Sequence, residues 1–493
     1  MRILVTGGTG VVGRSAITAL LQRGHVVRLF SRRADENAAQ WSHGVHPVNG
    51  DVTERAALEN AADGCDAVLH LTGIVSESGT QTFERVNVDG TRNAVAEAER
   101  AGVRKLVFVS SLGAEHGTSA YHESKRRAEA IVRRFSGAWL VLRPGNVYGP
   151  GDGQISLMLR LVRSLPVLPT LGDGERQFQP IWHEDLAEAI ALALERDDLA
   201  RRELDLAGAE LTSQNDLVRR LSEITQRNVS QLPVPETLAR WGARAASAIG
   251  VGVPVNESQM QMIADGSAIQ PGRENAVMTV FGITPTPLDA ALRKLADGQD
   301  EQLPDDGVGG LRRRRYRADI DGSGMTPEQL IAYVAARFSA LLASYVEARV
   351  EPGTNGLAVG ATVTLTLPLR GQMQVRVEEF EPRVITLVTL SGHPLSGAVR
   401  LLGEVRGDDL RFEVQVYDRA ASVADFLMMR AVGDRMQDAS WRELVENVAR
   451  ASGGAAPAGV EQDSEVLDED QAELIEEWVR GLAIERKRDQ AGV

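Results

Sequence analysis

The chain has 493 residues, too many for a single hydrophobic core, and this predicts two or three domains. Its apolar content of 43% and charged content of 25% are those of an ordinary globular protein. A formal net charge of −14 argues against nucleic acid as a partner, and no uninterrupted apolar stretch reaches the roughly 18 residues of a membrane span. The single cysteine, Cys65, excludes an intramolecular disulfide. Because the N-terminus also lacks a signal-peptide pattern, the sequence predicts a cytoplasmic protein.

Strand-like and helix-like segments alternate over the first 150 residues. Their continuous apolar runs are typical of parallel strands that are covered on both faces. This alternation predicts an α/β fold with a doubly wound parallel sheet. The predicted strands are residues 2–7, 25–30, 45–51, 66–73, 105–111 and 139–149.

A more helical, proline-interrupted lobe follows to residue 295, so the first domain is predicted as residues 1–295. The polar, glycine-containing segment 296–319 is predicted to be a linker. It includes "LRRRRYR" (311–317), a basic run that we expect to be solvated or paired with acidic neighbours.

Residues 320–452 are predicted to form a smaller α+β domain: a helix, five strands of an antiparallel sheet, and a long helix over about 423–450. One face of such a sheet is free to hold a ligand. Apolar side chains on the long helix are interpreted either as plain core or as the wall of a hydrophobic ligand pocket. These side chains are Phe426, Leu427, Met428 and Met429.

Residues 453–493 are predicted to be a flexible acidic tail that carries an amphipathic helix. The apolar stripe of this helix is expected to dock on its own protein or on a second copy in a homo-oligomer, and a foreign protein partner is the alternative. The stripe consists of Leu474, Ile475, Trp478, Val479 and Leu482.

The stretch "VTGGTGVVGRS" places Gly7, Gly10 and Gly13 between the first strand and the first helix. Glycine allows a sharp turn, a close approach of the backbone to a pyrophosphate, and tight packing of helix on strand. The N-terminus of the helix then offers N–H groups and the positive end of its dipole to phosphate. The sequence therefore predicts a nucleotide-binding site at this junction.

Several further motifs carry a family resemblance over about the first 300 residues. They are "TGGTGVVG", "GDV" (50–52), "HLTG" (70–73), "NVDGTRN" (87–93), "YHESK" (121–125), "RPGNVYGPGD" (143–152) and "PIWHEDLAEAI" (180–190). As a set they resemble the extended and atypical short-chain dehydrogenase/reductase superfamily, with its epimerase/dehydratase-like members. The sequence is most similar to atypical members such as the NADPH-binding accessory subunit of respiratory complex I. The resemblance implies a Rossmann fold and a nicotinamide cofactor.

The end of the second strand, "FSRRADE", has Arg32 and Arg33 where NAD-preferring sites carry an acid. Guanidinium groups match a 2′-phosphate in charge and in geometry, so NADP(H) is favoured and NAD(H) is the alternative. The resemblance implies a set of residues around the cofactor. These are Gly7, Thr9, Gly10, Val11, Val12, Gly13, Arg32, Arg33, Asp51, Val52, Leu71, Thr72, Gly73, Asn87, Tyr121, Lys125, Pro144, Asn146 and Val147.

Tyr121 and Lys125 are four residues apart and share one face of a helix. A neighbouring ammonium is expected to lower the pKa of the phenol toward a working range. The resemblance implies that Lys125 also holds the nicotinamide ribose and that a serine orients the substrate carbonyl. Ser111 is preferred to Ser110 for that role, and a shift of register would place Leu112 there. No histidine, cysteine or carboxylate cluster has metal-ligand spacing.

Three functions remain open. The first is NADPH-dependent reduction of a small or hydrophobic carbonyl by Tyr121, Lys125 and Ser111. The second is a non-catalytic NADPH-binding sensor, assembly or scaffold protein with a lipid- or partner-binding C-terminal domain. A sugar-nucleotide epimerase or dehydratase is the third, and it is disfavoured because only residues 112–120 separate Ser111 from Tyr121. Through Gly392-His393-Pro394, the C-terminal domain resembles DUF1990-type domains and, more loosely, helix-grip lipid-binding folds.

Overall fold

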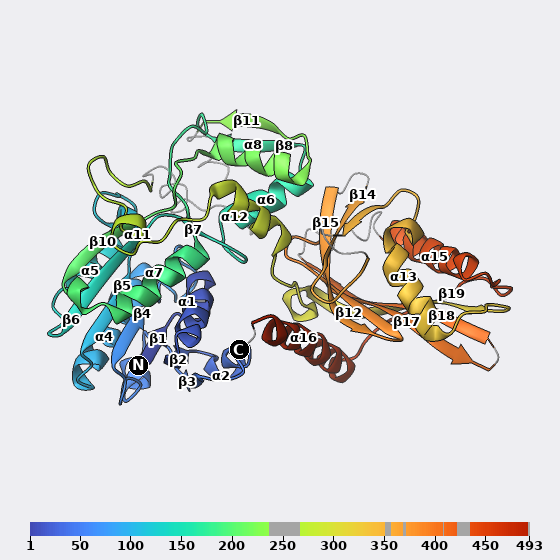
Figure 1. Cartoon of the computed structure of the whole chain (residues 1–493), viewed down its shortest axis with the longest axis horizontal. Coiled ribbons are helices and arrows are strands. Elements are labelled where there is room, and N and C mark those ends of the chain that lie inside the picture. The colour runs from blue at the N-terminus through green and yellow to red at the C-terminus, as the bar shows by residue number, and fades with distance from the viewer. Residues whose placement is uncertain (236–266, 351–355, 368–370, 408, 422–433, 492–493) are drawn as a thin grey trace. The chain divides into compact units, whose positions relative to one another are not determined.

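The computed structural model describes residues 1–235, 267–350, 356–367, 371–407, 409–421 and 434–491. The chain divides into two compact units, Met1–Ala296 and the part that begins at Asp297 (Figure 1). Among the described residues, no helix combines the length and apolar character that crossing a bilayer requires.

A seven-stranded parallel sheet forms the centre of the first unit, in the order β10-β6-β5-β4-β1-β2-β3. The strand order reverses between β1 and β4, and doubly wound sheets bind ligands at the carboxyl ends of the strands at such a point. The predicted doubly wound sheet is therefore confirmed. The strands are β1 (Arg2–Thr6), β2 (Val26–Ser31), β3 (Val45–Asn49), β4 (Ala67–His70), β5 (Lys105–Val109), β6 (Ala138–Pro144) and β10 (Arg202–Leu206).

Helices cover both faces of this sheet. Ile3 and Val5 of β1 face the core under α1, α7 and α11, whereas Leu4 faces the core under α3, α4 and α5. Successive side chains of a strand point to opposite faces, so a strand covered on both sides must be apolar throughout. The helices are α1 (Val11–Gln22), α2 (Ala34–Ala38), α3 (Arg55–Leu58), η1 (Glu84–Asp89), α4 (Gly90–Arg100), η2 (Leu112–Ala114), α5 (Ala120–Val132), α7 (His183–Glu195), η3 (Asp197–Leu199) and α11 (Ala276–Thr279).

A smaller lobe of the first unit has its own core, built around Leu159, Leu217 and Leu292. Two short parallel strand pairs, β7 with β9 and β8 with β11, accompany its helices. The elements are β7 (Val147–Tyr148), α6 (Ile155–Ser164), β8 (Val167–Leu171), β9 (Ile181–Trp182), α8 (Gln214–Thr225), β11 (Ser230–Val234) and α12 (Leu288–Asp297).

The second unit is built on an eight-stranded antiparallel sheet, in the order β13-β14-β15-β16-β17-β18-β12-β19. Helices α13 and α15 pack on one face, and α16 packs on the other. Thr326 and Gln329 form a capping box that, with Pro327 in the first turn, fixes where α13 begins. The predicted antiparallel sheet with helices is confirmed. The elements are η4 (Pro304–Asp306), β12 (Val308–Ile320), α13 (Pro327–Leu341), β13 (Glu347–Val350), β14 (Thr362–Leu367), β15 (Gly371–Glu381), β16 (Val384–Thr389), β17 (Leu395–Arg406), β18 (Asp409–Ala420), α15 (Asp434–Ala451), β19 (Glu461–Val466) and α16 (Glu469–Ala491).

The prediction of a linker over 296–319 is wrong, because β12 occupies its second half and lies between β18 and β19. Its basic run is neutralised on both sides. Arg312 and Arg314 bind Asp418 of β18, and the alternate arginines form a ladder with the acidic residues of β19. The ladder pairs Arg313 with Glu465, Arg315 with Asp463 and Arg317 with Glu461.

The prediction of a flexible tail over 453–493 is also wrong, because β19 and α16 belong to the second unit. Ile475, Trp478 and Val479 pack against the sheet through Tyr417 and Ala398, so the apolar stripe docks on its own chain. Leu482 is half-buried, and Leu474 remains 67% exposed. The predicted pocket residues Phe426, Leu427, Met428 and Met429 lie outside the described residues, and α15 is described from Asp434.

Candidate active site

The glycine loop after β1 has the geometry that its sequence predicts. Gly7 has a φ of +73°, and a Cβ placed on it would lie 2.6 Å from the backbone nitrogen of Thr72. A Cβ on Gly13 would lie 2.4 Å from the carbonyl oxygen of Gly7. Helix α1 begins after Gly10, which offers no side-chain cap to its first N–H groups. These groups are therefore available to an anion at the carboxyl edge of the sheet.

The surrounding residues fit a dinucleotide cofactor. The hydroxyl oxygens of Ser31, at the end of β2, and Thr72, after β4, are buried and have no hydrogen-bond partner among the described residues. Arg32 and Arg33 follow β2 and are exposed, with Arg33 only 3.6 Å from Glu36. The carboxylate of Asp51, beyond β3, accepts a hydrogen bond from the Thr53 backbone N–H at 2.9 Å. Hydroxyl groups that lack partners and cationic side chains at one sheet edge suit ribose and phosphate groups.

The other residues predicted to line the cofactor site lie in the same elements or at the ends of neighbouring ones. Thr9 is in the glycine loop, Val11 and Val12 open α1, Val52 follows Asp51 and is buried, and Leu71 and Gly73 follow β4. Pro144 ends β6 and Val147 begins β7. Asn146, between them, donates a 2.7 Å hydrogen bond to Gln154 and accepts one from Ser267.

Tyr121 and Lys125 lie on α5, which Ser119 caps by accepting a hydrogen bond from the backbone N–H of His122 at 3.2 Å. Both side chains are buried, at 8% and 4% exposure. The Lys125 ammonium donates to the carbonyl of Val109, at the end of β5, at 3.1 Å. It lies 2.9 Å from the point where a Cβ on Gly73 would stand, so the ammonium packs directly against this glycine.

The structure distinguishes the two candidate serines. The side chain of Ser111 hydrogen-bonds Tyr121. Ser110 instead donates to a Glu129 carboxylate oxygen at 2.7 Å, and that carboxylate is held in a buried ion pair with Arg143 at 2.7 Å. Ser110 is thus committed to the packing between α5 and β6, whereas Ser111 lies beside the phenol. Leu112, the alternative register, begins η2.

The pKa of Tyr121 is raised to about 12, because burial outweighs the hydrogen bond from Ser111. The expectation that a neighbouring ammonium lowers this pKa is therefore wrong for the structure as it stands. The pKa of Lys125 is itself lowered to about 8, because the ammonium is buried and the opposing attraction of Glu129 is weaker. Desolvation is thus the largest influence on both groups, and it favours the neutral form of each.

The motif "HLTG" begins with a buried residue, His70, that was not among the predicted site residues. The two ring nitrogens of His70 hydrogen-bond the hydroxyls of Thr6, at 2.6 Å, and Thr91, at 3.0 Å. Burial, reinforced by the charge of Lys125, lowers the pKa of His70 to about 3, so the ring is neutral. Thr91 in turn donates to the carbonyl of Asn87 at 2.6 Å. The sequence does contain a signal for this role, because His70 directly precedes Leu71, Thr72 and Gly73, which were predicted to line the cofactor site.

Asn87, predicted as a cofactor residue, lies in η1, a wide helical turn that continues into α4. Such turns are common at functional sites because they displace side chains from the regular helix spacing. Its side-chain oxygen accepts from the Ile74 backbone N–H at 2.8 Å, and its amide donates to Ser124 at 2.9 Å. Asn87 therefore ties the loop after β4 to α5.

Two histidines of the motifs serve the packing around the site. The ring of His183 hydrogen-bonds Ser15 of α1 at 2.5 Å. His122 is buried, and a Cβ on Gly113 would fall 2.2 Å from its ring. In the part of the chain that the structure describes, no group of three histidine, cysteine or carboxylate side chains could hold a metal ion.

Residues 3–206 match the model of the NAD dependent epimerase/dehydratase family. Sterol demethylase protein B of Methylococcus capsulatus is 30% identical over 262 residues, which are 48% of this chain and 79% of that relative. The chain therefore belongs to the NAD dependent epimerase/dehydratase family. The family match ends at residue 206, so the resemblance of the second unit to DUF1990-type domains stays a prediction.

Two reductases are also similar to this chain. Ceramide reductase of Caulobacter vibrioides is 37% identical over 175 residues, which are 35% of this chain and 55% of that relative. The 2-alkyl-3-oxoalkanoate reductase of Stenotrophomonas maltophilia is 31% identical over 218 residues, which are 40% of this chain and 66% of that relative. This chain thus spans just over half the length of the first reductase and 66% of the second.

Proposed function

We propose that the first unit is an NADPH-dependent reductase that acts on the carbonyl group of a hydrophobic substrate. The observation that carries the proposal is the grouping of Ser111, Tyr121 and Lys125 near the loop after β4, which contacts the glycine loop where Thr72 meets Gly7. The Tyr121 phenol hydrogen-bonds Ser111, and the Lys125 ammonium lies against Gly73, next to the cofactor cradle.

Arg32 and Arg33 favour NADPH, because both are exposed directly after β2. The residue at the end of that strand is Ser31, not the acid that NAD-preferring sites carry there. Gly7, Gly10 and Gly13 leave room for the pyrophosphate, and Ser31 and Thr72 offer buried hydroxyls. When bound, the nicotinamide supplies the hydride that reduces the carbonyl carbon.

In this mechanism Ser111 donates a hydrogen bond to the carbonyl oxygen and orients it. Tyr121 transfers its phenolic proton to that oxygen as the hydroxyl product forms. A pKa of about 12 keeps the phenol protonated at neutral pH, which suits a proton donor. Lys125 holds the ribose hydroxyls in this proposal and, when charged, stabilises the phenolate that remains.

The hydrophobic substrate class is supported by the relatives, since one is a ceramide reductase and another a 2-alkyl-3-oxoalkanoate reductase. The short loop 112–120 disfavours a sugar nucleotide, which is large and polar.

The test is oxidation of NADPH and of NADH by the whole chain with aldehydes, ketones and quinones of increasing hydrophobicity. Tyr121→Phe should lower kcat by roughly 100-fold or more, because it removes the proton donor, and should leave NADPH affinity within about twofold. Tyr333→Phe, in the second unit, is the matched control.

Turnover that persists in Tyr121→Phe would refute the assigned mechanism. Tight NADPH binding without turnover of any carbonyl would instead favour the alternative, a non-catalytic NADPH-binding sensor or scaffold. The burial of Tyr121 at 8% exposure is the observation that keeps this alternative open.

A further inference from the structure

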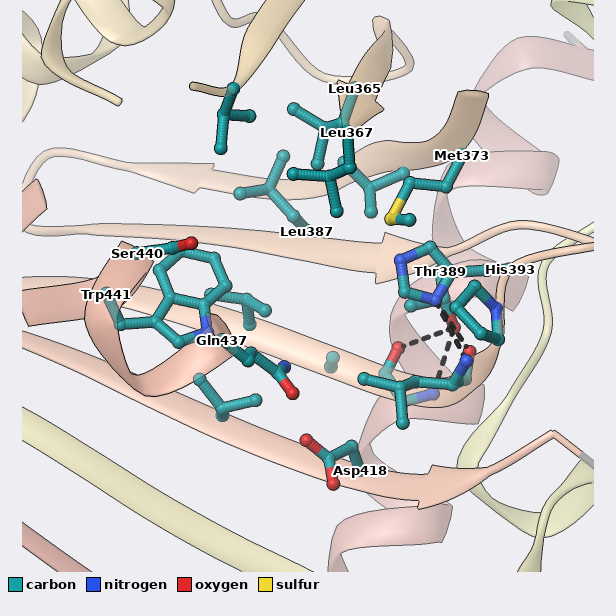
Figure 2. A pocket seen from close by; sticks show the side chains of 18 of the residues that line it. Leu365, Leu367, Met373, Leu387, Thr389, His393, Asp418, Gln437, Ser440 and Trp441 are labelled. Carbon is teal, nitrogen blue, oxygen red and sulfur yellow. Dashed lines mark hydrogen bonds between the residues drawn. The ribbon is translucent and has the colours of Figure 1, made fainter. Parts of the chain in front are cut away.

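A cavity of about 120 Å³ lies in the second unit, between the sheet and the helices α13 and α15 (Figure 2). Strands β14 to β16 contribute Leu365, Leu367, Met373 and Leu387, and Figure 2 shows these side chains gathered along one side. Helix α15 contributes Trp441 on the opposite side. The lining is almost wholly apolar, so the free space favours a hydrocarbon group.

The size of the cavity limits its occupant. An apolar protein cavity of about 150 Å³ holds one benzene molecule. At about 120 Å³, this cavity suits a group of about six heavy atoms and is too small to enclose a sterol or a long-chain lipid. The cavity therefore has room for a small molecule, or for the end of a longer one.

The polar groups at the β16 and β17 end of the cavity are engaged with their own chain. The Thr389 hydroxyl accepts a hydrogen bond from the Gly397 backbone N–H at 2.9 Å, and His393 hydrogen-bonds the Leu395 backbone N–H at 3.1 Å (Figure 2). Near α15, Asp418 is paired with Arg314, and Ser440 hydrogen-bonds Tyr345 at 2.6 Å. These polar groups already have partners within the protein, so they do not require a ligand.

Trp441 differs from them. Its indole nitrogen is buried and has no hydrogen-bond partner among the described residues. Figure 2 shows that nitrogen on the edge of the ring that faces Gln437, another lining residue. A buried N–H without an acceptor costs free energy comparable to a lost hydrogen bond, and an acceptor in the cavity would recover it.

We propose that this cavity binds a small hydrocarbon group bearing one oxygen, a ketone or acyl carbonyl, that accepts a hydrogen bond from Trp441 Nε1. The apolar part of the ligand fills the space toward Leu365, Leu387 and Met373. All of these residues belong to the second unit, so the proposal does not depend on the reductase activity proposed for the first.

The test is titration of the whole chain, labelled with ¹⁵N in its six tryptophan indoles and free of NADPH, with pentan-2-one. The paired probe is 2-methylpent-1-ene, in which a CH₂ group replaces the carbonyl oxygen. Pentan-2-one should move the Trp441 indole resonance downfield and saturate, with an affinity about fivefold above that of the alkene. Trp441→Phe identifies the resonance and should remove the difference in affinity.

Trp478→Phe, which removes an indole from α16 outside the cavity, is the matched control and should bind pentan-2-one as the unmodified chain does. Val399→Phe fills the cavity and should abolish binding of both probes. Nonan-2-one distinguishes the two sources of the ligand: tighter binding than pentan-2-one indicates the end of a longer chain, and weaker binding a small free ketone. A Trp441 resonance unmoved by pentan-2-one, or equal affinities for ketone and alkene, would overturn the proposal.

Discussion

Three titratable side chains lie near the carboxyl ends of β4 and β5, and all are buried: His70, Tyr121 and Lys125. Burial is the largest cause of the pKa shift in each case. The shifts keep His70 and Tyr121 neutral at neutral pH, and they lower the pKa of Lys125 to about 8. Sequence spacing predicted that Tyr121 and Lys125 share a helix face. It could not predict their pKa values, because desolvation depends on what the rest of the fold places around them.

The low pKa of His70 predicts a pH dependence of stability. An unfolded histidine gains a proton below about pH 6.5, whereas the folded ring stays neutral down to about pH 3. The stability that the neutral His70 ring contributes is therefore complete above pH 6.5 and is lost as the pH falls, by about 2.5 kcal/mol between pH 7 and 4.5. Urea unfolding at pH 7 and at pH 4.5 measures this loss. Between the two pH values the free energy of unfolding of His70→Asn should fall by about 2.5 kcal/mol less than that of the unmodified chain.

The exposed His43→Asn serves as the control for the loss of a histidine. Equal losses of stability in the His70→Asn variant and the unmodified chain would mean that His70 is protonated in the folded protein.

At the scale of elements, the turn between β1 and α1 shows how a local sequence motif determines a structure through close packing. Two of its glycines are required by close backbone contacts: Gly7, which also has a positive φ, lies against Thr72, and Gly13 lies against Gly7 and Gly8. Gly73 differs from them, because the nearest atom to a Cβ there is the Lys125 ammonium, at the movable end of a long side chain.

Gly13→Ala tests this requirement. The new Cβ would lie 2.4 Å from the Gly7 carbonyl oxygen and 2.5 Å from Gly8, so the loop must move away from the path of a pyrophosphate. NADPH affinity, measured by fluorescence titration, should fall by at least tenfold, while the far-ultraviolet circular dichroism spectrum is retained.

Gly153→Ala is the matched control for this substitution, since a Cβ on Gly153 meets nothing within 4 Å. The NADPH affinity of this variant should equal that of the unmodified chain. Unaltered NADPH binding in Gly13→Ala would place the cofactor elsewhere.

Strand β12 is an element that the sequence did not predict. Its arginines suggested a solvated linker, yet alternate positions from Arg314 to Ile320 are buried, and the intervening arginines meet β19. The two-residue alternation of a strand was present in "RYRADI", although the charges obscured it. The partner strand lies about 150 residues further along the chain, so its neutralising acids were not visible locally.

At the scale of the molecule, each compact unit encloses its own cores. The first is built on the two faces of the parallel sheet and on the smaller lobe, and the second on the two faces of the antiparallel sheet. A unit with a complete core can fold alone.

A chain ending at residue 296 should therefore fold and bind NADPH with an affinity within about threefold of that of the whole chain. Thermal unfolding and NADPH titration of the two proteins make the comparison. The same fragment carrying Gly13→Ala is the negative control for binding. A fragment that is unfolded, or that binds NADPH more than tenfold more weakly, would show that the second unit completes the first.

The sequence by itself determined the doubly wound sheet, the glycine loop and the family, because apolar runs, turn glycines and motif spacing act over short stretches of chain. It also gave the pairing of Tyr121 with Lys125 through one helical turn. The tertiary structure decided that Ser111 rather than Ser110 lies beside the phenol, and that burial raises the pKa of Tyr121. It likewise decided that residues 308–320 and 461–491 complete the second unit. These outcomes depend on partners distant in the chain, whose burial and charge no local pattern records.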